Sequence, residues 1–137
     1  MKKKQLITDA APGAIGPYSQ GIDTGKMIFV SGQIPADPKD GTFPEGIEKQ
    51  TERALLNVKA VLESAGCDMS DVVKTTVLLK DMDDFTAMNG VYETFFTSPY
   101  PARAAYEVVR LPKDAMVEIE AIAVKTAKNK GKEKKKK

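Results

Sequence analysis

One stretch near the carboxyl-terminal end limits what this chain can fold into more than any other. From Val117 to Val124 the side chains alternate with period two, which is the pattern of a half-buried strand. One face of this strand is wholly apolar and consists of Val117, Ile119, Ala121 and Ala123. The opposite face carries Glu118 and Glu120 among the apolar residues Met116, Ile122 and Val124. Because burying a charge is costly unless the charge is paired, the two carboxylates on this face need a reason.

An arginine in the preceding extended run supplies one such reason. Arg103 follows Pro101, and a Leu-Pro-Lys-Asp turn at residues 111–114 connects its run to the strand with the glutamates, since proline fixes φ and aspartate favours turns. Arginine holds a carboxylate through two parallel hydrogen bonds. An arginine clamp beside strand-borne glutamates would bind a small acid and carry out proton chemistry on it. The alternative is a structural Arg–Glu pair within the sheet.

The remaining elements predict a single α+β domain. Further strands are expected at Lys4–Thr8, Tyr18–Thr24, Met27–Gly32 and Val72–Lys80. A first helix is expected to open at Pro44 and to end at the C-cap Gly66. A second helix is expected to start at a cap formed by Asp83 or Asp84 and to stop before Pro99. The order βββ-α-β-α-ββ predicts a mixed sheet with two helices packed on one face.

Three of these strands look too apolar for such a sheet to stand alone. The segments Met27–Val30, Val72–Leu79 and Met116–Val124 carry apolar residues on both faces, whereas two helices cover only one face. The uncovered face therefore needs a partner, and another copy of the chain is the simplest one. We expect an obligate oligomer with clefts between subunits, where ligands commonly bind.

Charge is unevenly distributed along the 137 residues. The formal net charge is +2, but residues 128–137 hold seven lysines and one glutamate, and the body from Gln5 to Ala127 carries −7. We expect a folded domain over residues 1–127 and a disordered lysine-rich tail over residues 128–137. An acidic body argues against a nucleic-acid groove on the domain, so no specific nucleic-acid partner is expected.

Targeting signals also point one way. No apolar run approaches the ~20 residues that cross a bilayer, and no apolar segment follows the lysines at positions 2–4 as a secretion signal would require. The single cysteine, Cys67, excludes an intramolecular disulfide and fits a reducing compartment. We therefore expect a cytoplasmic protein that binds no membrane.

Residue usage restricts the chemistry. The sequence has no histidine and one cysteine, which excludes Ser-His-Asp and Cys-His catalysis, a histidine-ligated metal and a thiolate zinc site. It also has no phosphate-binding loop and no Gly-x-Gly-x-x-Gly motif. We therefore expect neither a metal nor a cofactor. Acid–base work would fall to carboxylates, tyrosines or ordered water, and desolvation can raise the pKa of a glutamate on an apolar strand face.

A dipeptide inside the second expected helix is unusual. Asn89 and Gly90 are both poor helix formers, and glycine alone costs ~1 kcal/mol against alanine. Asn89 lies one turn after Phe85, near the buried side. Either the pair is a tolerated surface feature, or the amide points into a site.

Several motifs, in order along the chain, resemble the Rid family of reactive imine and enamine deaminases. These are Ile15–Ile22 (IGPYSQGI), Val30–Pro35 (VSGQIP), Val73–Val77 (VKTTV), Pro101–Arg103 (PAR), Glu107–Val108 (EV), Arg110–Asp114 (RLPKD) and Val117–Val124 (VEIEAIAV). The resemblance covers the chain from about Ile7 to Val124. It implies a chorismate-mutase-like fold in a homotrimeric barrel, with sites in the clefts between subunits. It also implies hydrolysis of 2-imino acids such as 2-iminobutanoate and 2-iminopropanoate to 2-oxo acids and ammonia, so small 2-imino and 2-oxo acids are the expected ligands.

The resemblance assigns roles by position. Arg103 matches the carboxylate-binding arginine, and Glu118 matches the residue that orients or activates the attacking water. The rest of the pocket lining is matched by Tyr18, Ser31, Gly32 and Asn89, which favours the functional interpretation of Asn89. Glu120 matches no catalytic position and is expected to form a structural ion pair.

The chain departs from the family pattern in three places. Ala105 stands where many members have cysteine, which excludes thiol chemistry at that position. Val109 replaces a small or basic residue, and the lysine tail extends past the usual end. Two other functions compete with the deaminase: an endoribonuclease or translation inhibitor, against which the acidic body and missing histidine weigh, and a non-catalytic chaperone-like trimer.

Overall fold

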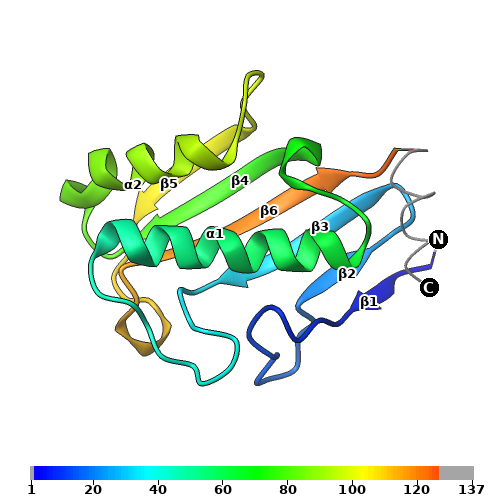
Figure 1. Ribbon diagram of the computed structural model, residues 1–137, viewed down its shortest axis with the longest axis horizontal. Coiled ribbons are helices and arrows are strands. Elements are labelled where there is room, and N and C mark those ends of the chain that lie inside the picture. Colours follow the sequence, from blue (N-terminus) through cyan, green and yellow to red (C-terminus); the bar gives the residue numbers. More distant parts are fainter. Residues whose placement is uncertain (1, 127–137) are drawn as a thin grey trace.

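A computed structural model describes residues 2–126 of the chain (Figure 1). Its strands are β1 (Lys4–Leu6), β2 (Gly21–Asp23), β3 (Met27–Gln33), β4 (Val72–Leu79), β5 (Ala102–Glu107) and β6 (Val117–Val124). Its α-helices are α1 (Ile47–Ser64) and α2 (Phe85–Tyr92), and its short 3-10 helices are η1 (Met69–Asp71), η2 (Met82–Asp84), η3 (Glu93–Phe95) and η4 (Pro112–Asp114). The order βββ-α-β-α-ββ is confirmed. The expected tail at residues 128–137 lies outside the described residues.

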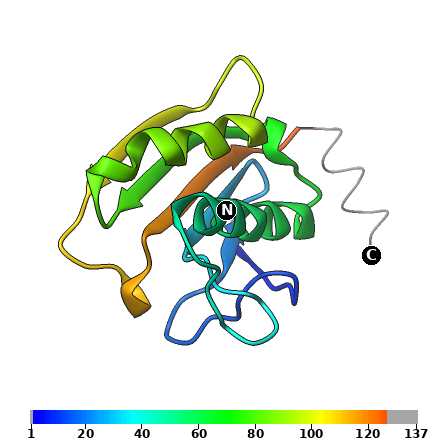
Figure 2. The ribbon, with the colours of Figure 1, turned by 60° about the vertical axis from the view of Figure 1, so that its left-hand side comes forward.

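The six strands form one mixed sheet in the order β1-β2-β3-β6-β4-β5. Only the β4–β5 pair is parallel, and every other neighbouring pair is antiparallel. Both helices lie on the same side of this sheet, as predicted (Figures 1 and 2). The last two strands along the chain are not neighbours, because β4 lies between them.

The helix ends differ from the predicted ones. Helix α1 starts three residues later than Pro44, because Gly46 has a positive φ of 89° that cannot continue a helix. Its end is as predicted: Gly66 has φ 79°, and the Cys67 amide turns back to the Leu62 carbonyl at 3.0 Å. Asp84 stands at the N-cap position of α2, one of the two predicted residues, but its side chain makes no capping hydrogen bond. The capping hydrogen bond is made one turn earlier, where Asp81 accepts the Asp83 amide at the start of η2.

Two elements are shorter than predicted. The strand expected over Tyr18–Thr24 is reduced to Gly21–Asp23, because the preceding residues form a loop. The second helix was expected to continue almost to Pro99, but it ends at Tyr92 and passes into η3.

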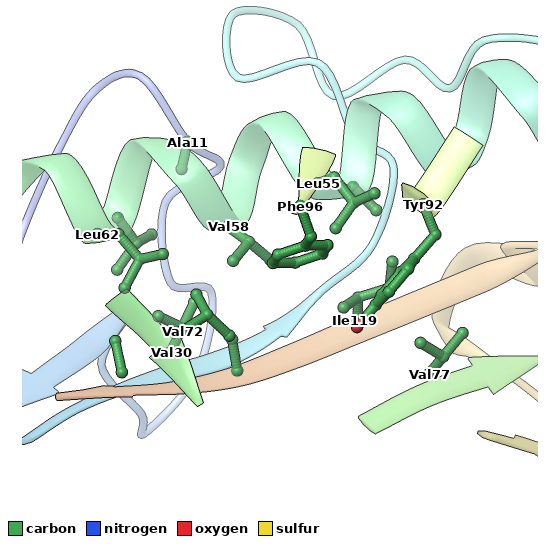
Figure 3. Close-up of a cluster of buried hydrophobic side chains, with 14 of the residues drawn as sticks. Ala11, Val30, Leu55, Val58, Leu62, Val72, Val77, Tyr92, Phe96 and Ile119 are labelled. Atoms are coloured by element: carbon green, nitrogen blue, oxygen red, sulfur yellow. The ribbon is translucent and has the colours of Figure 1, made fainter. Parts of the chain in front are cut away.

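The core lies between the helices and the covered face of the sheet. The inward side of α1 contributes Ala54, Leu55, Val58, Val61 and Leu62, all 0% exposed. The inward face of β6 is the apolar face predicted from the sequence, with Val117, Ile119, Ala121 and Ala123 buried. Figure 3 shows Tyr92 and Phe96 entering the same core, next to residues of α1 and the sheet. Burial of this apolar area is the main source of the fold's stability.

The opposite face of the sheet carries apolar side chains without a covering layer. Ile22, Phe29 and Ile122 are register partners in one row across β2, β3 and β6. Phe29 is 41% exposed, Val124 is 40% exposed and Tyr106 is 56% exposed. We call this surface the open face. Within residues 2–126, neither helix is long and apolar enough to span a membrane.

Candidate functional site

Arg103 lies on the edge strand β5 and points toward helix α2. Its Nη1 donates a hydrogen bond to Asn89 Oδ1 at 2.7 Å. Its guanidinium carbon lies 4.8 Å from the Tyr92 ring centre and 5.3 Å from the Phe85 ring centre, within the range of cation–π attraction. The structure therefore brings together two of the predicted site residues, Arg103 and Asn89. The Asn89 side-chain amide points at the arginine.

Two hollows meet at Arg103. One, of about 690 Å³, is lined by Asn89, Tyr92, Tyr100, Pro101 and Arg103, among others. The second, of about 700 Å³, includes Phe85, Arg103 and Ala105. The arginine head group is therefore open to molecules that enter from outside the domain.

Glu118 lies on the open face of β6, as the alternating pattern predicted. It is half-buried, and within residues 2–126 its carboxylate accepts no hydrogen bond. Burial raises the pKa of this carboxyl above its usual value, and the negative charge of Glu120 raises it further. A half-buried carboxyl group with a raised pKa is a candidate for proton transfer.

Gly32 is fitted to this glutamate. A Cβ added at Gly32 would collide with the Glu118 carboxylate, so only glycine leaves room for the observed side-chain position. The neighbouring Ser31 donates its hydroxyl to the Ser19 carbonyl, and its amide donates to the Gln20 carbonyl at 3.0 Å. These contacts hold the loop that carries Tyr18 against the end of β3.

A smaller and more enclosed hollow, of about 180 Å³, lies beside this group. Its lining includes Tyr18, Gly32, Ile34 and Lys113. Tyr18 and Gly32 line this hollow, Ser31 is the neighbour of Gly32 in β3, and Glu118 lies against Gly32.

Two buried amides that the sequence analysis did not single out tie down the walls of this hollow. Gln20 accepts the Thr8 amide at 2.8 Å and donates to the Pro12 carbonyl at 2.8 Å. Asn57 of α1 donates to the Ile34 carbonyl at 3.1 Å. For Asn57, the available sequence signal was an amide next to the apolar residues Ala54, Leu55 and Val58 of the helix.

The expected clamp of Arg103 beside the glutamates is wrong within one chain. Arg103 is the register partner of Thr75, which is buried under the helices. Glu118 is the partner of Leu78, three residues further along β4 and therefore on the other face. Arg103 and Glu118 point to opposite sides of the sheet with β4 between their strands. A structural pair between Arg103 and Glu118 of the same chain is excluded by the same geometry.

Glu120 also differs from its expectation. It is exposed, and within residues 2–126 no cation pairs with it. Its effect is on Glu118, whose pKa it helps to raise. The described part of the chain contains no group of three or more His, Cys, Asp or Glu side chains that could hold a metal ion.

Comparisons with known proteins agree on one family. Residues 8–125 match the family model described as Endoribonuclease L-PSP. The 2-iminobutanoate/2-iminopropanoate deaminase of Salmonella typhimurium is 53% identical over 125 residues, which cover 89% of this chain and 98% of the relative.

Solved structures give the same fold. The crystal structure of Escherichia coli TdcF with bound serine superposes with a TM-score of 0.87 at 48% identity, covering 90% of this chain and 99% of that chain. The crystal structure of the YjgF gene product from Escherichia coli gives a TM-score of 0.86 at 52% identity, covering 90% and 99%.

Proposed function

The chain belongs to the Endoribonuclease L-PSP family, and from this premise we propose that it is a hydrolytic deaminase of reactive 2-imino acids. Its substrates are small 2-imino acids such as 2-iminobutanoate and 2-iminopropanoate, and its products are 2-oxo acids and ammonia. The Rid resemblance found in the motifs is confirmed by relatives named for this activity. The observation that carries the proposal is an arginine held in place for a carboxylate, together with a glutamate whose pKa is raised.

Each residue has a defined part in the reaction. Arg103 binds the substrate carboxylate through charge-assisted hydrogen bonds. Glu118 takes a proton from water as the water oxygen bonds to C2 of the protonated imine, and the C=N electron pair moves to nitrogen, giving a neutral amino alcohol at that carbon. Glu118 then returns this proton to nitrogen, the C2–N bond breaks, ammonia leaves, and the hydroxyl proton is released to water as the 2-oxo group forms. Water is the only co-reactant, and the proton that Glu118 takes up is returned.

The pocket is completed by Tyr18, Ser31, Gly32 and Asn89. Asn89 contacts the arginine, whereas the other three lie with Glu118. The bound serine in the TdcF structure supports a small amino-acid-like ligand for this site.

The assembly we propose is a homotrimer with sites between subunits. Two observations support it: Arg103 and Glu118 point to opposite faces of one sheet, and the open face carries an uncovered apolar row. In a cyclic assembly, Arg103 of one copy can face Glu118 of the next across an interface.

A coupled assay tests the activity. Threonine dehydratase releases the imine, and semicarbazide competes with the added protein for it. Added wild-type protein is expected to lower the yield of semicarbazone and to raise the rate of 2-oxobutanoate formation, whereas Arg103→Ala should not. An unchanged semicarbazone yield with wild-type protein would reject the deaminase. RNA cleavage that persists in Arg103→Ala would instead favour the endoribonuclease named in the family description.

Subunit mixing tests the assembly. Arg103→Ala and Glu118→Gln proteins are each expected to be inactive, but co-refolded mixtures should recover about one quarter of the wild-type turnover if a site uses one residue from each neighbour in a cyclic trimer. No recovery, with trimers present by sedimentation, would place both residues in one subunit's site.

A further inference from the structure

The support beneath Arg103 is more elaborate than a carboxylate clamp requires. Three residues of α2 contact the arginine, and they are Phe85, Asn89 and Tyr92. Their spacing of four and then three residues places them on one face of the helix. Together with Thr75 of β4, we call these residues the arginine mount.

Tyr92 and Thr75 contact each other, and each of them is also a neighbour of Arg103. Thr75 is the register partner of Arg103 across the β4–β5 pair. Its hydroxyl shares a hydrogen bond of 2.7 Å with the Tyr92 hydroxyl, in a buried position. The Tyr92 ring in turn lies 4.8 Å from the guanidinium carbon. The Tyr92 ring is therefore linked through its hydroxyl to Thr75, the residue of β4 that pairs with Arg103.

The hydroxyl pair of Tyr92 and Thr75 lies in the protein interior, where a polar group needs a reason. Tyr92 is 5% exposed and Thr75 is 0% exposed. Phenylalanine and valine would fill nearly the same space without two polar groups that each need a partner. Burial raises the pKa of Tyr92, so its hydroxyl stays protonated and available as a donor. Packing alone therefore does not account for the pair.

The Asn89 contact within the arginine mount also determines which edge of the Arg103 guanidinium has no protein partner. Nη1 is occupied by Asn89. In the part of the chain that the structure describes, Nε and Nη2 donate to no protein atom. These two donors are parallel and match the two oxygens of a carboxylate.

We propose that Tyr92, held by Thr75, is a positioning residue that fixes Arg103 so that its Nε–Nη2 edge receives the substrate carboxylate. This role rests on the proposed deaminase function. Tyr92 acts through Arg103 and not on the reacting atoms. Its loss is therefore expected to weaken carboxylate binding and to raise KM, with a much smaller effect on kcat.

Two matched core substitutions separate this role from packing. Phe96 is 6% exposed and its ring centre lies 4.7 Å from that of Tyr92, but within residues 2–126 the rings that Arg103 lies over are those of Phe85 and Tyr92, not that of Phe96. Tyr92→Leu is expected to weaken binding of 2-oxobutanoate on the order of tenfold, since it removes a cation–π contact and frees the arginine. Phe96→Leu should lower the melting temperature comparably and leave the affinity unchanged. Tyr92→Phe should fall between wild type and Tyr92→Leu, because it keeps the ring but not its tie to Thr75.

Calorimetric titration and thermal melts on these variants decide the matter. Wild-type affinity in Tyr92→Leu, or an equal loss in Phe96→Leu, would overturn the proposal.

A measurement without substrate keeps the test independent of the deaminase. Nitrogen-15 relaxation of the Arg103 Nε–H group is expected to report a rigid side chain in the wild type and in Phe96→Leu, and a mobile one in Tyr92→Leu. If wild-type protein neither binds 2-oxobutanoate nor consumes imine, the proposed function fails while the relaxation data still test the mount. Equal rigidity of Arg103 in all three proteins would overturn the mount.

Discussion

The two halves of the proposed site are built in opposite ways. Arg103 is exposed at the sheet edge, yet its head group is held by an amide and two aromatic rings from one helix. Glu118 is half-buried, yet its carboxylate accepts no hydrogen bond within residues 2–126. Contacts within the chain thus orient the Arg103 head group before a ligand binds, whereas the Glu118 carboxylate has no hydrogen-bond partner within residues 2–126. We call Arg103 and its contacts the binding half, and Glu118 and its surroundings the proton-transfer half.

This difference suits the roles proposed for Arg103 and Glu118. An arginine that must bind an anion loses less entropy if it is already oriented, so its neighbours hold it in place. A glutamate that exchanges a proton works best with a pKa near the working pH, and no cation within residues 2–126 pairs with Glu118 to lower its pKa. The opposite faces of the sheet allow both environments in one small domain.

The largest effect is expected from a substitution that disables the proton-transfer half alone. Glu118→Gln keeps the shape of the side chain but cannot take up a proton, so turnover of 2-iminobutanoate should fall by ~10²–10⁴-fold. Binding of 2-oxobutanoate should remain, because the arginine half is intact. Steady-state kinetics and calorimetry measure the two properties separately. Turnover at the wild-type rate would show that the assigned mechanism is wrong.

The next largest effect is expected from a substitution that weakens the binding half. Arg103→Lys keeps the charge but loses the planar pair of donors, and one lost charge-assisted hydrogen bond weakens 2-oxobutanoate binding by about 10- to 100-fold. Turnover under saturating substrate should fall less than the affinity does. An affinity equal to that of the wild type would mean that charge alone, and not the paired geometry, binds the carboxylate.

A smaller effect comes from the space around Glu118. Gly32→Ala places a methyl group where the carboxylate lies, and the flexible side chain must move away. We expect turnover to fall by roughly tenfold with little change in melting temperature, since only the far end of a side chain is displaced. In a double-mutant cycle the loss should largely disappear in the Glu118→Gln background. Additive losses would show that Gly32 acts independently of the glutamate.

The smallest effect is in the pH dependence. The pKa of Glu118 is raised in the folded protein, so the stability linked to its protonated form is present below the ordinary value and is lost as pH rises through the raised value. Thermal melts should therefore show Glu118→Gln gaining stability relative to wild type as pH rises from acid to neutral. Glu120→Gln removes a nearby negative charge and should shift the acid limb of the wild-type pH–rate profile to lower pH. An unchanged limb would leave burial as the only cause of the raised pKa.

Much of the fold could be predicted because its signals are local. The element order, the C-cap at Gly66 and the apolar inward face of β6 follow from side-chain periodicity and backbone preference. The differences are also local: Gly46 delays the start of α1, and the capping hydrogen bond is made by Asp81 at η2 and not by the side chain of the N-cap residue Asp84. In each case a nearby residue offered the backbone a better alternative.

The candidate site was predicted less completely. Its members could be named from family motifs, and Asn89 was recognisable as an unusual residue inside a helix. Tyr92 was not singled out from the sequence, because its partner Thr75 lies 17 residues earlier on another element. A hydroxyl among phenylalanines was the only sign of its additional contact.

By itself the sequence determined that Glu118 and Glu120 share one face of a strand and that Arg103 stands near a sheet. It also determined the family, through motifs spread over most of the chain. Only the tertiary structure decided that β4 lies between β5 and β6, and that Arg103 and Glu118 point to opposite faces. The physical reason is that side-chain alternation depends on neighbouring residues, whereas strand order and register depend on long-range pairing and on which faces the core can bury.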